Sequence, residues 1–485
     1  MAGIGFELKK LFSKKGILLQ ARANLYASLV VAGPMLLGVL LLLGAKYVSG
    51  FGGASTHQQD LIVVIITYSL LFSLILVSSL LFVLARYIAD MLYVNAYNRI
   101  LPSMYGSISI LLIVGSVLWL IFLYISKLEL KYSIFSFILF CEGIVVWIQI
   151  NYISAIKEYR GILAGFLLGI ITGLFFGFVF IRLNFDVVAS LLAGACIAYG
   201  IMFIDFTVIL HRFFPMGTGS PFKFLEWIDE YPQLPLVGFF STLGLFIHLM
   251  LMWSSPWGVQ VDGLFYHAPA HDIPALFAFL TSLITVVNFV TSVEVNFYPK
   301  YRLYVSLLNG DGSLSNIDKA YEDMTSVLKQ ELFFLAILQI FFTLFSIVLV
   351  GEAMAYFKLG FTPSMIGMFR VLCVGYGIFA IANCIMLFLL YFASNTDAMW
   401  AAISFFVFNA VGTFITIKLS DAYYGFGFVI ASAIFYFIGL RFLFSYIDHL
   451  DFHIFTNQPV FFIKKKGFLT RLVERLEAKE AQPES

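Results

Sequence analysis

Long apolar runs recur along this chain at the length that a helix needs to cross a lipid bilayer. Twelve such runs, each of roughly 20 residues, alternate with short segments rich in charge or in Gly, Pro and Asn. Backbone polar groups in lipid must be paired within the spanning segment, so these runs are expected to be helices. The sequence is 61% hydrophobic and 12% charged, which excludes a water-soluble globule, and it lacks the alternation of a β-barrel. The pattern predicts an all-α polytopic membrane protein with twelve transmembrane helices.

The runs form two sets of six, on either side of a Pro- and Gly-rich connection. A pair of six-helix bundles with the substrate path between them is a common plan among transporters. The predicted spans are residues 25–49, 61–84, 105–126, 132–156, 161–181, 187–210, 236–253, 273–297, 332–350, 366–392, 400–417 and 426–444. The expected divisions are a basic amphipathic segment at 1–24, an N-terminal bundle at 25–210, a cytoplasmic connection at 211–235, a pseudo-symmetric C-terminal bundle at 236–446 and a basic tail at 447–485.

Basic residues fall mostly on one side of this topology. With both termini inside the cell, the inside segments hold 22 of the 29 lysines and arginines. Cytoplasmic loops carry such an excess, and their positive charge faces an anionic lipid leaflet. The sequence therefore predicts a multi-pass protein of the cytoplasmic (inner or plasma) membrane with both termini in the cytoplasm. It implies no nucleic-acid partner.

Both ends of the chain interleave apolar and basic side chains. Residues 4–15 and 461–476 each combine Phe, Leu or Ile with several lysines or arginines. Such segments resemble helices that lie on the inner membrane surface. A solvated tail is the alternative for each segment, and the sequence leaves that choice open.

Glycines and one proline mark special helix faces. Glycine recurs every four residues through the fifth span, at Gly161, Gly165, Gly169, Gly173 and Gly177. Missing side chains on one face let another backbone approach, so we expect a packing seam, with a sliding surface as the alternative. Gly33 and Pro34 lie inside the first span. Proline bends a helix there, which makes the pair a gating candidate or a static kink.

Ionisable residues within the spans are the candidates for lining a transport cavity, because a charge at a helix centre is costly without a partner or water. Arg86 and Asp90 lie four residues apart and can pair on one helix face. Glu294 occupies the equivalent place in the second half, and Glu142 lies deepest in its span. Snorkelling or local pairing is the alternative for each. The candidates are Arg86, Asp90, Glu142, Asp205, Glu294 and Arg370.

Enzymatic chemistry is not expected. The sequence has no Gly-x-x-x-x-Gly-Lys-Ser/Thr loop for ATP. His267 and His271 have metal-like spacing, but no further ligand accompanies them. We therefore predict no cofactor, no metal and no catalytic residue. A membrane glycosyltransferase is a separate hypothesis. Such an enzyme would need charged catalytic groups on large outside loops, whereas the predicted outside loops of this chain are short.

The opening string MAGIGFELKKL at residues 1–11 resembles the start of the PelG family of Pel exopolysaccharide transporters, within the multidrug/oligosaccharidyl-lipid/polysaccharide flippase superfamily. The resemblance continues through Arg86-Tyr-Ile-Ala-Asp90, residues 224–238 and residues 294–302, and covers nearly the whole chain. It implies two six-helix lobes, alternating access to a central cavity, and export of an amino-sugar polysaccharide used in the biofilm matrix. It also implies a cytoplasmic glycosyltransferase and cyclic di-GMP-responsive membrane subunits as partners.

Two alternatives from the same superfamily stay open beside polysaccharide export. A lipid-linked glycan flippase would use cationic groups such as Arg86 and Arg370 to hold a pyrophosphate. A cation-coupled antiporter would use the acidic residues inside the spans. A scaffold role within a synthase complex is the hypothesis that involves no transport.

Overall fold

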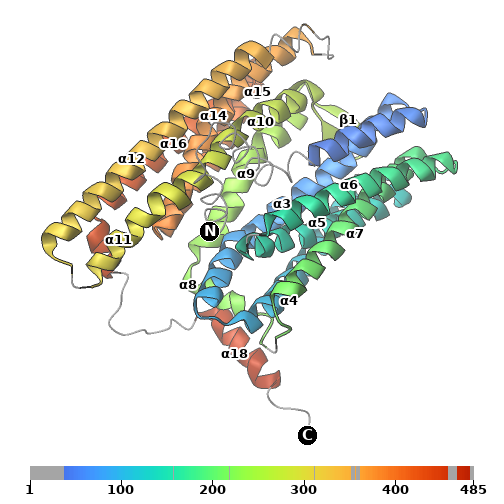
Figure 1. Ribbon diagram of the computed structural model, residues 1–485. Coiled ribbons are helices and arrows are strands. Elements are labelled where there is room, and N and C mark those ends of the chain that lie inside the picture. Colours follow the sequence, from blue (N-terminus) through green and yellow to red (C-terminus); the bar gives the residue numbers. More distant parts are fainter. Residues whose placement is uncertain are drawn as a thin grey trace, which may run out of the picture. The chain divides into compact units, whose positions relative to one another are not determined.

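The structure is a computed structural model that describes residues 38–156, 158–217, 219–310, 312–350, 356, 361–456 and 467–480. The gating candidates Gly33 and Pro34 and the amphipathic segment at residues 4–15 lie outside these residues. Within them, eleven helices are long and apolar enough to cross a membrane, and a shorter apolar helix, Gly38–Phe51, covers the end of the first predicted span (Figure 1). The prediction of an all-α polytopic membrane protein is confirmed.

Each of the other eleven predicted spans corresponds to one of the eleven long helices. These helices are α3 (Thr56–Tyr93), α4 (Ile100–Ser126), α5 (Leu130–Ile156), α6 (Tyr159–Arg182), α7 (Val187–Phe213), α9 (Gln233–Trp253), α10 (Pro269–Thr291), α12 (Leu314–Phe345), α14 (Pro363–Tyr391), α15 (Asn395–Leu419) and α16 (Phe426–Ile447). Shorter elements are η1 (Tyr97–Arg99), η2 (Lys223–Leu225), α8 (Glu226–Glu230), the π-helical η3 (Ser292–Phe297) and η4 (Ser346–Val350), α11 (Tyr298–Leu308), η5 (Asp421–Tyr423), α17 (Leu450–Thr456) and α18 (Phe468–Glu480).

Several helices extend beyond the predicted spans. The helix α3 continues to Tyr93, and α10 continues through η3 and α11 to Leu308. Hydropathy identifies only the part of a helix that lies in lipid. The helix itself can continue into water, because its backbone hydrogen bonds do not require apolar side chains. The extensions therefore hold the charged residues that ended the apolar runs.

Local sequence sets where these helices begin and end. At the start of α3, the Ser55 hydroxyl accepts a hydrogen bond from the Gln58 amide, and the Gln58 side chain accepts one from the Ser55 amide. This reciprocal pair satisfies two amides that the first turn leaves free. The chain turns after α3 at Asn95, where φ is 56°. Asparagine tolerates this left-handed conformation better than most residues.

The described chain forms two compact units. One contains residues 38–243, 258–267 and 467–480, and the other contains residues 244–257 and 268–456. The first is called the N-unit and the second the C-unit. A short hairpin and the C-terminal helix α18 thus group with the N-unit, although both follow it in the sequence.

The N-unit is built around α3, which packs against α4, α5 and α7, while α6 lies along α7 (Figure 1). Its outer surfaces are apolar: Ile113, Leu118 and Tyr124 of α4 are 68%, 55% and 86% exposed. Lipid tolerates such a surface, whereas water would drive it to aggregate. These exposed faces therefore agree with a bilayer environment.

The predicted outside loop between the seventh and eighth spans contains an antiparallel hairpin that the sequence did not predict, β1 (Val259–Asp262) and β2 (Phe265–His267). It rests on α3, where the Tyr68 hydroxyl donates to the Tyr266 carbonyl at 3.0 Å and accepts from the Tyr266 amide at 3.1 Å. One tyrosine thus satisfies both backbone groups of a strand residue.

The C-unit has α14 at its centre, packed against α10, α12, α15 and α16. Aromatic rings fill its core: Phe405 and Phe435 stack with centroids 4.9 Å apart, and Phe379 lies against both. A buried amide, Gln339, accepts from the Thr285 hydroxyl at 2.5 Å and donates to Thr343 at 3.1 Å. Buried polar groups of this kind are satisfied across helices rather than by water.

Candidate functional site

Arg86 and Asp90 form an ion pair near the end of α3. The Arg86 Nε atom lies 3.3 Å from the Asp90 Oδ2 atom, one helical turn apart. The same Oδ2 accepts a hydrogen bond of 2.8 Å from the Trp227 indole, and the Arg86 guanidinium lies over the Tyr231 ring at 5.4 Å. Both candidates therefore hold the connection between the bundles against α3.

Glu142 lies near the midpoint of α5, with its carboxylate turned toward α7. A Cβ atom placed on Gly200, itself near the midpoint of α7, would lie 3.2 Å from the Glu142 Oε1 atom. The Oε2 atom is buried and makes no hydrogen bond to the described residues. A carboxyl group in this position is costly unless it exchanges a proton or meets water or a cation.

Asp205 lies on a different face of α7 from Gly200 and contacts α6. A Cβ atom on Gly165 would lie 2.8 Å from the Asp205 Oδ2 atom. The other glycines of this face also meet α7: a Cβ on Gly169 would lie 2.6 Å from the Ala198 carbonyl oxygen, and one on Gly173 would lie 2.5 Å from the Gly194 carbonyl oxygen. Gly161 and Gly177 face Ile209 and Leu191 of the same helix. The glycine face of α6 thus lies directly on the α7 backbone.

The two remaining candidates belong to the C-unit. Glu294 lies in η3, the π-helical turn between α10 and α11. Such turns interrupt regular helices and are frequent at functional sites. Arg370 is an exposed residue in the first third of α14. The candidates therefore divide between the two units, four in the N-unit and two in the C-unit.

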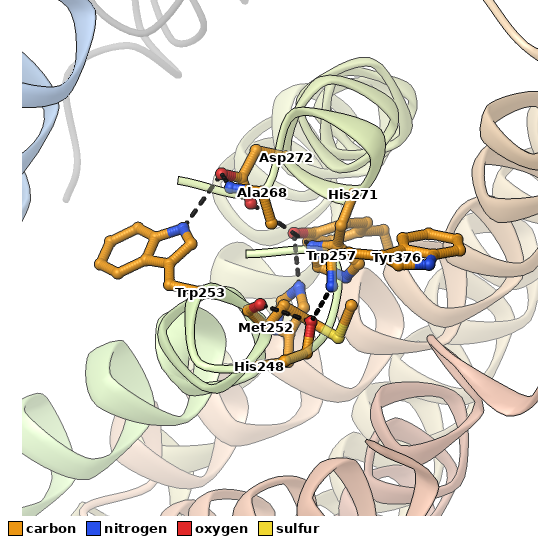
Figure 2. A network of polar contacts seen from close by, with 9 residues as sticks. His248, Met252, Trp253, Trp257, Ala268, His271, Asp272 and Tyr376 are labelled. Carbon is orange, nitrogen blue, oxygen red and sulfur yellow. Dashed lines mark hydrogen bonds and ion pairs between the residues drawn. The ribbon is translucent and has the colours of Figure 1, made fainter. Parts of the chain in front are cut away.

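A buried polar network joins α9, α10 and α14 of the C-unit (Figure 2). His248 of α9 and His271 of α10 are each 1% exposed, and their rings meet edge to face with centroids 5.5 Å apart. The Tyr376 hydroxyl of α14 lies 3.2 Å from the His248 Nε2 atom and shares a hydrogen bond with it. The His248 ring also stacks on Phe428 at 4.3 Å.

Asp272 completes this network at the beginning of α10. Its Oδ2 atom accepts hydrogen bonds from the Trp253 indole at 3.0 Å and from the Ala268 amide at 2.9 Å (Figure 2). A carboxylate in the first turn is also favoured by the helix dipole. Asp272 therefore fixes the end of α9 to the start of α10.

Sequence reasoning named His271 for its spacing from His267, but it missed His248 and Tyr376, which form the rest of this network. His248 interrupts an apolar run, which is the one signal that could have found it. Tyr376 gives no such signal, because tyrosine is common throughout this chain. Among the described residues, no group of three or more His, Cys, Asp or Glu side chains is arranged to hold a metal ion.

The sequence matches a family profile over residues 1–455. The profile is described as "PelG: Putative exopolysaccharide Exporter (EPS-E)". No curated protein matches the sequence significantly.

Solved structures of transporters have the same fold. An outward-facing multidrug resistance MATE family transporter of the MOP superfamily aligns with a TM-score of 0.58 and 13% identity, over 87% of this chain and 96% of that chain. The Vibrio cholerae MATE transporter VcmN, in a mutant form, aligns with a TM-score of 0.57 and 12% identity, over 89% of this chain and 99% of that chain. A MATE protein in the bent conformation aligns with a TM-score of 0.55 and 11% identity, over 88% of this chain and 97% of that chain. Identities this low establish a shared fold alone.

Proposed function

The chain belongs to the PelG family of putative exopolysaccharide exporters, and from that premise we propose that it exports a Pel-like amino-sugar polysaccharide across the cytoplasmic membrane. A cytoplasmic glycosyltransferase that acts in complex with the chain would build the polymer. The polymer would then move through a passage between the two helical bundles. Cyclic di-GMP-responsive membrane subunits would complete the assembly, and both termini would face the cytoplasm. The family match carries this proposal, and the superfamily fold supports it.

The side chains of this protein suit a sugar polymer. An N-acetylated glycan is recognised by hydrogen bonds and by aromatic faces, and the chain has 25 Tyr and 6 Trp residues. We propose that the six ionisable candidates line the passage and that Gly33 and Pro34 contribute to its gating.

A lipid-linked glycan flippase has less support from the contacts. A pyrophosphate would need free cationic groups. Arg86 is already engaged by the Asp90 carboxylate and by the Tyr231 ring. Holding a diphosphate at Arg86 would require breaking both contacts.

Cation coupling is the second candidate function, and Glu142 favours it. Its buried Oε2 atom is without a partner among the described residues, at mid-height in α5. A carboxyl group placed there binds and releases protons or cations more readily than it serves packing. Cation coupling would supply the energy for polysaccharide export, so the two proposed functions are compatible.

Reconstitution tests both proposals. The chain and its matching glycosyltransferase would be placed in vesicles with the cytoplasmic face outward, and a labelled sugar-nucleotide donor would be added outside. Polymer inside the vesicle survives a glycoside hydrolase added outside, and we expect protected polymer only when the chain is present. An imposed proton or sodium gradient, with and without an ionophore, then measures coupling.

Each outcome decides one point. Polymer that stays sensitive to the hydrolase would reject export by this chain. Bond formation by the chain without the glycosyltransferase would favour an enzyme, and export that ignores every gradient would reject cation coupling. Normal complex assembly with no export by the natural chain would favour a scaffold.

A further inference from the structure

The C-terminal helix α18 is fastened to the connection between the bundles. Asp229 of α8 accepts hydrogen bonds from the Thr470 amide at 2.7 Å and from the Thr470 hydroxyl at 2.8 Å. Thr470 lies in the first turn of α18, where backbone amides lack partners within the helix. Asp229 therefore caps α18 across 241 residues of sequence.

An ion cluster adds a second attachment. The Lys223 Nζ atom lies 2.6 Å from the buried Glu226 carboxylate and 3.4 Å from Glu477 of α18. Burial lowers the pKa of Lys223, but the hydrogen bonds and charges of Glu226 and Glu477 outweigh it and raise this pKa above its usual value. Lys223 thus stays charged and holds α18 to η2.

The docked face of α18 is not its apolar face. Thr470 and Val473, which are 2% and 0% exposed, lie on the docked face with Glu477. On the opposite face Phe468 is 76% exposed and Leu472 is 39% exposed, four residues apart and thus on one stripe. The exposed Arg471 and Arg475 lie along one edge of this stripe. Such a helix presents apolar and basic groups together to whatever lies outside it.

The place of α18 in the N-unit suits a membrane surface. Figure 1 shows α18 running across the bundle end at which α8 lies, rather than along the long helices. The connection just before η2 packs against α4, because the Pro221 backbone lies at Gly106. Gly106 is six residues into α4, or about 9 Å along its axis. The connection that carries α18 therefore lies at the level where α4 enters its apolar span.

We propose that α18 is a lipid-binding helix, whose Phe468 and Leu472 stripe enters the anionic inner leaflet while Arg471 and Arg475 contact its phosphate headgroups. An apolar stripe with arginines beside it is a surface that interfacial helices use. Bound to lipid and to α8 at once, α18 fixes the connection to the membrane. The family match covers residues 1–455, and α18 begins after it, at Phe468. The proposal rests on the proposed orientation of the chain and not on its substrate.

The test uses the full chain in nanodiscs with one environment-sensitive fluorophore. The natural cysteines Cys141, Cys196, Cys373 and Cys384 are replaced first, and the fluorophore is attached at Leu476→Cys on the apolar side of α18. Glu474→Cys, on the other edge of the helix, is the matched control. In discs that contain phosphatidylglycerol we expect a blue shift and quenching by spin-labelled lipid at position 476 and not at 474.

Variants that remove the two arginine charges measure how much these charges contribute to lipid binding. Each arginine near an anionic surface strengthens binding by about fivefold, so R471Q/R475Q should lower the lipid-inserted fraction relative to the exposed fraction by about 25-fold. Both side chains are exposed, so the variant keeps the fold. Equal emission in phosphatidylcholine and phosphatidylglycerol discs would overturn the proposal. A blue shift at position 476 that arises only when the glycosyltransferase is added would also overturn it, because that result would identify a protein-docking surface. Because no transport is measured, the result is independent of the exported substrate.

Discussion

The Nδ1 atom of His271 lies 3.5 Å from the Oδ1 atom of Asp272, and neither atom has a hydrogen bond within the described part of the chain. The two atoms are therefore neighbours that no hydrogen bond joins. Meanwhile the other carboxylate oxygen of Asp272 holds Trp253 and the Ala268 amide. One residue thus serves as the structural link between α9 and α10 and as the neighbour of a titratable ring.

Asp272→Ala should destabilise the protein. It removes the acceptor from the buried Trp253 indole and from the Ala268 amide, at a cost of about 1–3 kcal/mol for each unsatisfied group. Asp272→Asn, the matched control, keeps one acceptor oxygen and should lose less. Thermal unfolding in detergent measures both variants. A double-mutant cycle with Trp253→Phe should show coupling of about 0.5–3 kcal/mol, and zero coupling would contradict the link.

Glu142→Gln should separate stability from export. The amide keeps the shape of the side chain and removes the charge that the buried carboxyl group can carry, so the unfolding free energy should stay equal or rise. Export in the vesicle assay should fall at least tenfold if Glu142 serves coupling. Glu129→Gln, whose side chain is 62% exposed just before α5, is the control and should export normally. Full export by Glu142→Gln would remove this residue from the mechanism.

Gly173→Ala should weaken the α6–α7 contact. The added methyl group would lie 2.5 Å from the Gly194 carbonyl oxygen, and overpacking of this kind costs about 1–3 kcal/mol. Gly367→Ala in α14 is the matched control, because a Cβ there meets nothing within 4 Å. We expect this control to stabilise its helix by up to about 1 kcal/mol. Equal melting temperatures for the two variants would show that the seam tolerates separation.

Asp229→Ala should loosen α18 without disturbing the spans. Losing a helix cap costs about 0.5–2 kcal/mol, which should appear as faster amide hydrogen exchange at residues 468–480. Glu230→Ala, one residue away, is the control.

The Lys223 attachment has its own pH signature. The raised pKa of Lys223 means that its contribution is complete below the unfolded value of about 10.4 and is lost as the pH rises through the folded pKa. Exchange at α18 should therefore be protected from neutral pH to about pH 10 and increase above it. Exchange that doubles between pH 7 and pH 9, after correction for intrinsic rates, would contradict the role of Lys223.

The membrane spans could be predicted from the sequence, whereas most of the candidate-site contacts could not. A run of apolar residues is a local property, and only a helix satisfies its backbone in lipid. Arg86 and Asp90 were placed together correctly as a possible pair for a similarly local reason, because residues four apart share a helix face. The hairpin at residues 259–267 was missed, since its stability comes from Tyr68 on a distant helix.

For this protein, the order of amino acids by itself determined the membrane class and the position of each long helix, because the free energy of transfer into lipid depends on consecutive side chains. Only the tertiary structure decided that His248 meets Tyr376 and that Asp229 caps α18. These contacts depend on the rotation of each helix about its own axis and on its position along that axis relative to its neighbours. A helix that is apolar on every side carries little information about its rotation, so neighbouring helices set it through their packing.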